Sequence, residues 1–478
     1  NVSPSFLDDH LKVNLNAKGM YSKTSYANTG AIGNATSMDP TKPVYGDTEL
    51  YKKNYAGYWQ WASPVDWNDS EWKYGINTLA PTNPVSLLYL NSDKGDSKKL
   101  MGNLELDYKI HGFEDLRLHM NAGMDLGTGE SNKVRSPYNY DSGTYYYGNK
   151  GWNTMDTYNL SLSMYAQYTK EFNKNHYLDV MGGYEWQHFH KETDYFYCGM
   201  VPSTNNDSSI AGKPYNPSEN TLYKTENYLV SFFGRLNYSY ADRYLFTFTM
   251  RADGSSKFMK NNRWGYFPAA AFGWRIVEEP WMKNTKDWLS NLKLRLSFGT
   301  AGNNRISSAM YETTYRAYGN NKYYGAGNQQ NPHYTLNNSQ LANPDLKWET
   351  TITRNVGLDF GFLGERISGS LDYYWNTTKD LLLDAPVTAI GYTSMQQNIG
   401  QTSNRGVELN LNAAILRKKD YSLNFNFNVG FNKNKVDKLA GGQTYQSYNS
   451  GAFSTDMRGY DDYRVVVGQP LGLVYGFV

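Results

Sequence analysis

The sequence predicts an all-β protein, a transmembrane antiparallel β-barrel, and three observations lead to this fold class. Apolar and polar side chains alternate along short segments: Leu160, Leu162 and Met164 lie on one face of such a segment, with serines between them. A period of two over about ten residues is typical of a strand with one face in hydrocarbon and the other in water. These segments also come in pairs joined by tight polar turns, and long loops separate the pairs.

The composition fits a barrel better than a soluble domain. Mean hydropathy is low, at -0.69, yet aromatic residues make up 16% of the 478 residues. An outer-membrane barrel reconciles the two values, because its outer band is apolar, its interfaces carry aromatic girdles, and its lumen and loops are polar. No apolar run approaches the roughly 18 residues of a spanning helix. We therefore expect the chain to cross the bacterial outer membrane with strands.

Several function classes find no support. The net charge of +2 comes from 47 basic and 45 acidic residues that are interspersed, so no patch indicates a nucleic-acid partner. The single cysteine, Cys198, excludes an internal disulfide framework. No nucleophile, base and orienting acid can be assembled from spacing, so we expect neither an enzyme nor a cofactor. A hydrolase with Ser and His on adjacent strands is the alternative.

The expected strands follow one another in pairs, about fourteen in all, counting a stub at the start. Alternation defines them, and polar turns such as 112–115, 173–176, 241–243 and 363–365 join them. In order they are 1–5, 11–23, 100–110, 116–127, 160–168, 178–186, 228–240, 244–251, 264–276, 292–300, 348–360, 367–374, 407–415 and 423–431.

The connections alternate between short turns and long loops such as 25–99 and 301–347. Bacterial outer-membrane barrels have short periplasmic turns and long extracellular loops, which fixes the expected orientation. The chain begins without a signal peptide and stops inside an apolar segment. We therefore expect 1–478 to be one partial barrel domain, internal to a larger exported protein.

The face opposite the apolar one carries charges of both signs, which a packed core could not bury without a large desolvation cost. The lumen is therefore expected to be wet or filled by a polar plug. The inward candidates are Glu105, Asp107, Lys109, Arg117, His119, Asp179, Arg235, Arg251, Arg275, Lys293, Arg295, Asp359, Asp372 and Glu408.

The same alternation assigns a face to each residue of the later strands. We expect the lipid-facing set to include Leu294, Leu296, Leu409, Leu411, Phe425 and Phe427. The matching lumenal set is Arg295, Glu408, Asn410, Asn424 and Asn426.

Short blocks in a fixed order occupy the chain from Arg251 to Glu408. They read RADGSSKF at 251–258, RWGYFPA at 263–269, FGWRI at 272–276, EE at 278–279, LKLR at 292–295, NPDLKWET at 343–350, GLDF at 357–360, DYY at 372–374, TKDLL at 378–382, NIG at 398–400 and NRGVE at 404–408. In these blocks the sequence resembles the SusC-like (SusC/RagA) TonB-dependent outer-membrane transporters. The resemblance implies a 22-stranded barrel closed by an N-terminal plug, in Bacteroidetes-like bacteria. It also implies a SusD-like surface lipoprotein as partner and energy input from the TonB–ExbB–ExbD complex, with the plug and final strands lying outside this chain.

The function expected from this resemblance is active import of oligosaccharides. Import of peptides by the same mechanism is one alternative, and a passive porin or surface adhesin barrel is another. Loop aromatics could contact the ligand or the lid, or pack the loop itself: Trp59, Trp61, Trp67 and Trp72 are the candidates. The Tyr-rich stretches 138–147 and 315–324 have the same ambiguity. Arg251, Arg275 and Arg295 are the lumenal charges expected to contact a plug.

Two motifs invite a metal-site interpretation. His188 and His190 share one face of a strand, but no third ligand is near them in the sequence, so we expect polar residues beyond the membrane band rather than a metal site. The segment 253–256, Asp-Gly-Ser-Ser, lacks the alternating acidic ligands of a calcium loop, and we expect a structural turn there.

Overall fold

One large antiparallel sheet dominates the computed structural model of the protein, which describes residues 1–61, 80–139, 148–200, 212, 214–215, 221–313, 315–317, 323–324, 331–332, 334–336, 340–389, 391–448 and 461–476. Fourteen strands follow one another across this sheet, which confirms the predicted all-β class and strand number. They are β1 (Ser5–Phe6), β2 (Leu11–Tyr26), β3 (Asn91–Lys109), β4 (Leu116–Arg135), β5 (Asn149–Phe172), β6 (His176–Met200), β8 (Thr221–Tyr240), β9 (Tyr244–Ser255), β10 (Trp264–Arg275), β11 (Leu289–Asn303), β17 (Glu349–Phe362), β18 (Ile367–Lys379), β21 (Gln401–Arg417) and β22 (Ser422–Lys438).

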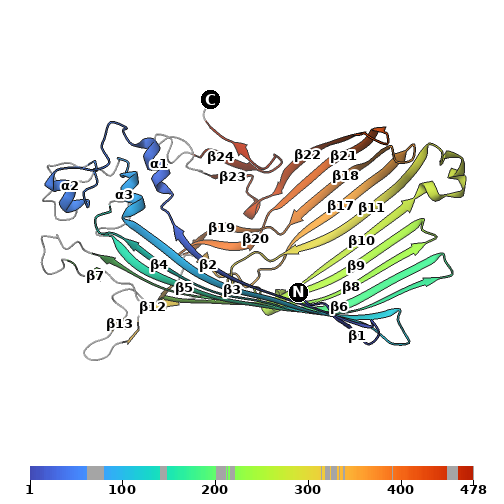
Figure 1. The fold of residues 1–478 in the computed structure, drawn as a ribbon, viewed down its shortest axis with the longest axis horizontal. Helices are drawn as coiled ribbons and strands as arrows, with labels where there is room; N and C mark the ends of the chain where they lie inside the picture. The colour runs from blue at the N-terminus through green and yellow to red at the C-terminus, as the bar shows by residue number, and fades with distance from the viewer. Residues whose placement is uncertain are drawn as a thin grey trace.

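The sheet curves into a trough-shaped wall, with the short turns at one end and the helices at the other (Figure 1). The helices are α1 (Gly30–Ser37), α2 (Glu49–Asn54) and α3 (Pro84–Tyr89). In the part of the chain that the structure describes, no helix is long and apolar enough to cross a membrane.

Short elements decorate the helical end and the periplasmic turns. The extra strands are β7 (Pro214–Tyr215), β12 (Tyr315–Ala317), β13 (Tyr323–Tyr324), β14 (Asn331–Pro332), β15 (Tyr334–Leu336), β16 (Gln340–Leu341), β19 (Leu382–Ala389), β20 (Tyr392–Asn398), β23 (Tyr445–Tyr448), β24 (Tyr463–Val466) and β25 (Leu473–Val474). Four 3₁₀ turns complete the set: η1 (Lys260–Asn262), η2 (Ile276–Glu278), η3 (Pro280–Thr285) and η4 (Ala440–Gly442).

Most strands are longer than alternation predicted. β5 and β6 contain 24 and 25 residues, more than twice the 9–11 or so that cross a bilayer. The predicted loop 25–99 was wrong at its far end, because β3 begins at Asn91, and the three helices organise much of the rest. Polar residues on both faces hid these extensions, although the hydrogen-bond ladder continues through them.

The register keeps one face of the wall apolar. Leu104, Ala122, Leu162, Trp186 and Val230 lie opposite one another on five successive strands. We call this the outer face, since an apolar band with aromatic rims is what lipid requires. The opposite face is called lumenal.

The later strands follow the same rule. Leu411 lies opposite Gly369 and Phe427, while its neighbour Asn410 lies opposite Ser370 and Asn428. Because paired residues share a face of the sheet, the predicted lipid-facing and lumenal sets fall on opposite faces. Their depth in the membrane stays a prediction.

The best-buried apolar cluster lies at the loop end of β9, β10, β11 and β17. Its members are Phe258, Phe267, Ile306, Leu346 and Trp348. Three of the blocks that carry the family resemblance supply four of these residues. The blocks therefore encode a local core beneath the extracellular loops.

Candidate functional site: the lumenal wall and the extracellular loop

Arg251 is the centre of one ion network on the lumenal face. Its guanidinium lies 2.8 Å from Glu185 and 2.7 Å from Asp253, and it donates to the Ser231 hydroxyl at 2.9 Å. The partners come from β6, β8 and β9, which are successive strands of the sheet. This network connects three strands by charge-assisted hydrogen bonds.

Arg295 on β11 is the centre of a second network. Its Nη2 lies 2.8 Å from Asp359 and 3.0 Å from Asp372, on the next two strands. Gly357 makes room for it, since a Cβ there would lie 2.7 Å from the guanidinium carbon. Three of the predicted inward charges thus pair with one another.

Arg275 lies apart from both networks, at the end of the wall with the short turns. Its guanidinium donates to the backbone carbonyl of Asp242 and to Glu278, at 3.2 and 3.4 Å. The predicted contact of Arg251, Arg275 and Arg295 with a plug stays a prediction. What the structure shows is that all three already have partners in the wall.

The Glu-Glu pair after β10 anchors the segment that leads to β11. Glu279 accepts hydrogen bonds from the Tyr244 hydroxyl at 2.6 Å and the Trp274 indole at 2.9 Å, and pairs with Arg243. The first two bonds are the main reason that the pKa of the Glu279 carboxyl lies below its usual range. A charged carboxylate therefore fixes this periplasmic connection.

The predicted turn at 253–256 was wrong for its first three residues, because Asp253 to Ser255 continue β9 and pair with β8, and the turn begins at Ser256. Asp253 pairs with Arg251, and the Ser255 hydroxyl accepts from the Asn304 amide at 3.1 Å. Ser255 is only 2% exposed. These contacts hold the end of β9 in place.

Trp348 is a central residue of the apolar cluster that lies beneath the extracellular loops. Its indole packs against Phe258 and Phe267, with ring centres 5.6 and 5.5 Å away, and its N–H donates to the Arg263 carbonyl at 2.7 Å. At Gly302 a Cβ would come within 2.0 Å of the Phe267 ring. The glycine is therefore required by close packing.

The first extracellular loop is organised around Asn83, which is 1% exposed. Its amide donates to the carbonyls of Val44 and Trp59 at 2.8 and 2.9 Å. Its side-chain oxygen caps α3 by accepting from Val85 and Ser86. One side chain thus ties the start, middle and end of the loop together.

Two of the four candidate tryptophans lie on this loop next to each other. Trp59 and Trp61 meet edge to face with ring centres 4.9 Å apart, and the Lys42 ammonium lies over both rings, at 6.0 and 5.3 Å. Both rings are half-buried, so they pack within the loop and also keep part of their surface exposed. Trp67 and Trp72 lie outside the described residues, as does most of 138–147 and part of 315–324.

One prediction follows from Asn83. Asn83→Ala should loosen the loop, because it removes a helix cap worth about 1 kcal/mol and leaves two carbonyls without their donor. We expect protease cleavage within 27–90 on intact cells to accelerate about tenfold or more. Asn28→Ala is the matched control, since Asn28 makes one local bond, to the Gly30 N–H. Equal cleavage of the two variants would contradict the role of Asn83.

The histidine motif has a third potential ligand that sequence spacing did not show. Glu226 on β8 lies opposite His190, and its carboxylate is 2.9 Å from His188 Nε2. The expectation that no third ligand is near was therefore wrong. The signal lay in strand register, which joins residues 36 positions apart.

Comparison with known proteins places this wall in a family. The family model described as "TonB dependent receptor-like, beta-barrel" matches residues 7–475. TonB-dependent receptor SusC of Bacteroides thetaiotaomicron is 43% identical over 94% of this chain, and TonB-dependent receptor P3 of Formosa agariphila is 32% identical over 77%. The chain spans 44% and 36% of the lengths of these relatives.

A solved structure shares the fold. The RagAB peptide transporter superposes with a TM-score of 0.73, at 22% identity, over 96% of this chain and 48% of that one. The named relatives are receptors rather than enzymes. The chain therefore belongs to the TonB-dependent receptor family of outer-membrane β-barrels, and within that family it is similar to SusC.

Proposed function

We propose that the full-length protein actively imports oligosaccharides across the outer membrane. A SusD-like lipoprotein would close the loop end, and the TonB–ExbB–ExbD complex would supply energy through a plug. Family membership supports the transport class. The plug, the partners and the substrate belong to the proposal, because this chain spans less than half of the similar receptor SusC.

The lumenal wall is the observation that carries the oligosaccharide proposal. Arg251 and Arg295 are each paired with two carboxylates, so both guanidinium groups already have partners within the wall. Such a surface offers hydrogen-bonding groups, and its arginines are not free to bind an anion. It suits a neutral, hydroxyl-rich ligand better than a peptide, whose charged termini would have to compete with the existing partners.

The extracellular loop supplies the second support. Aromatic faces stack on the apolar faces of sugar rings, and Trp59 and Trp61 hold such faces beside the Lys42 ammonium. In the proposed cycle the loops and lid capture the ligand. TonB then pulls on the plug, and the ligand passes along the polar wall. The paired charges keep the wall rigid during this passage.

Removal of the TonB box from the full-length protein tests energy coupling. We expect growth on the cognate oligosaccharide at limiting concentration to be lost, while binding of labelled oligosaccharide to whole cells stays nearly unchanged. Binding and translocation use different parts of the molecule, which is why the two readouts separate. Undiminished growth would instead indicate a passive porin.

The substrate class needs its own measurement. Whole cells that carry the intact protein should bind labelled neutral oligosaccharides, and an excess of mixed peptides should not displace them. If only peptides displace the label, the peptide alternative is favoured. Peptide is the cargo that the name of the RagAB transporter gives for that protein.

A further inference from the structure

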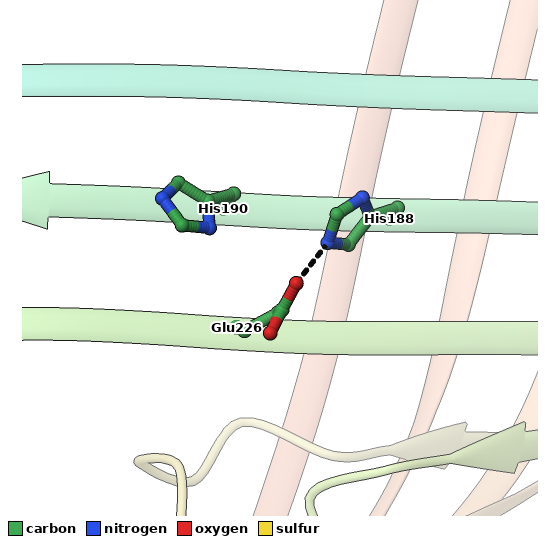
Figure 2. Close-up of side chains that lie close together, drawn as sticks. All are labelled: His188, His190 and Glu226. Carbon is green, nitrogen blue, oxygen red and sulfur yellow. Dashed lines mark hydrogen bonds and ion pairs between the residues drawn. The ribbon is translucent and has the colours of Figure 1, made fainter.

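We propose that His188, His190 and Glu226 form a Zn²⁺ site on the outer face of the wall, at the extracellular edge of the membrane band. Each residue offers one ligand atom, and these atoms all lie within 4.8 Å of one another. Within the described residues this is the one such group of three. Figure 2 shows the two rings side by side on β6, with the Glu226 carboxylate directed toward them from β8.

The strand geometry brings the three side chains together. His188 and His190 are two residues apart on β6, so they share a face, and Glu226 lies opposite His190 in the register. Zinc ligands at about 2.0–2.2 Å in a tetrahedral arrangement stand roughly 3.5 Å apart. Small side-chain rotations are therefore enough to close the group around one ion.

The donor set matches zinc. Two imidazoles and one carboxylate are a known combination for Zn²⁺ with a further position left for water or another ligand. Glu192, the next outer-face residue of β6, has its carboxylate 3.7 Å from His190 Nε2 and can fill that position. Calcium and magnesium prefer oxygen ligands only, so they should bind poorly here.

The rings are held in place by neighbours. Tyr158 stacks on His190 with ring centres 4.0 Å apart, and Tyr228 stacks on His188 at 4.4 Å. The Tyr228 hydroxyl also donates to Glu226 at 2.9 Å. Partners that orient ligating side chains in this way raise metal affinity, because less freedom is lost on binding.

Burial gives an independent indication. His190 is 3% exposed, and its Nδ1 is buried with no hydrogen-bond partner in the described part of the chain. A buried ring nitrogen without a partner costs free energy that a ligand would recover. A bound metal at either ring nitrogen would fix the tautomer and orientation of this ring.

The location separates this site from the transport path. His188 and His190 share the outer face with Trp186 and Leu160, whereas the lumenal networks lie on the opposite face. One row further along, the outer face becomes charged at Glu192 and Lys224. A metal here would connect β6 to β8 where both strands leave the lipid, and would not contact a passing ligand.

Zinc titration of the full-length protein in detergent, after removal of metals with a chelator, tests the proposal. We expect one Zn²⁺ per chain, with an affinity at least about 100-fold higher than that of His190→Phe or Glu226→Gln. His190→Phe keeps a ring against Tyr158, and Glu226→Gln keeps the side-chain shape. Co²⁺ should show the visible absorption of a four-coordinate site in the unsubstituted protein and not in these two variants.

His176→Gln is the matched control, because His176 lies on the same strand and face but bonds only to the Tyr238 hydroxyl among the contacts described. It should bind zinc like the unsubstituted protein. Heat-modifiable migration on gels verifies that each variant has assembled. Zinc binding that is absent, or equal in all four proteins, would overturn the proposal and show that the histidines serve the aromatic rim alone. This result would leave the transport proposal intact, since that proposal rests on the lumenal face.

Discussion

Leu411→Arg should largely prevent assembly of the full-length protein into the outer membrane, whereas Asn410→Arg should assemble nearly as well as the unsubstituted protein. Leu411 lies on the outer face, opposite Gly369 and Phe427, while Asn410 lies on the lumenal face beside Ser370. An arginine on the lipid face costs about 2–4 kcal/mol at the midplane, and a lumenal arginine stays in water. The two positions are adjacent in sequence, so they differ in the face of the sheet that they occupy more than in their depth in the membrane.

The measurement is the fraction of heat-modifiable, membrane-inserted protein in isolated outer membranes. A difference of about 2–4 kcal/mol corresponds to a factor of roughly 30 to 1000 in the assembled ratio at equilibrium. Leu411→Ala controls for loss of the side chain without a charge. Equal assembly of the two arginine variants would show that the assigned faces are wrong.

Trp348→Ala should unfold the local core beneath the loops while the membrane wall still assembles. Trp348 is 8% exposed and is surrounded by Phe258, Phe267 and Leu346, two of which have no exposed surface. Truncation of a buried tryptophan typically costs about 3–5 kcal/mol. Because the strands of the membrane band do not depend on this ring, the loss should stay at the loop end.

Hydrogen exchange reports this change directly. Amides of 256–263 and 343–349 should exchange about 100-fold faster or more, with little change in the turn at 241–243. The exchange rates of Trp348→Phe should lie between those of the unsubstituted protein and Trp348→Ala, since this variant keeps a ring but removes the hydrogen bond to the Arg263 carbonyl. Trp281, which is 64% exposed, gives the control Trp281→Ala. Similar exchange in the Trp348→Ala and Trp281→Ala variants would exclude a core role for Trp348.

Much of the wall could be predicted from the sequence, because contact with lipid on one face imposes a strict two-residue alternation of apolar and polar side chains. The strand number and the turns at 241–243 and 363–365 followed from alternation alone. The strand ends did not, because beyond the lipid both faces are wet and the apolar signal disappears. The start of β3, Asn91 to Lys99, contains no apolar side chain and resembles a loop.

The candidate sites were harder to predict for a different reason. The face of Arg295 followed from local alternation, but its pairing with Asp359 and Asp372 depends on the register of three strands. The same holds for Glu226 beside His188, because their contact depends on the register between β6 and β8. Residue types alone do not give such contacts between distant segments.

The length of β6 determines how far the wall extends beyond the membrane. After Trp186 its outer residues turn polar, with His188, His190, Glu192 and Asp194 in succession, and the strand continues to Met200. At about 3.4 Å per residue and a tilt near 45°, this continuation rises roughly 30 Å above the hydrocarbon. The lid proposed above, resting on such a collar, would lie above the bilayer surface. Such a lid would need a tether of roughly ten extended residues between its lipid and its folded body.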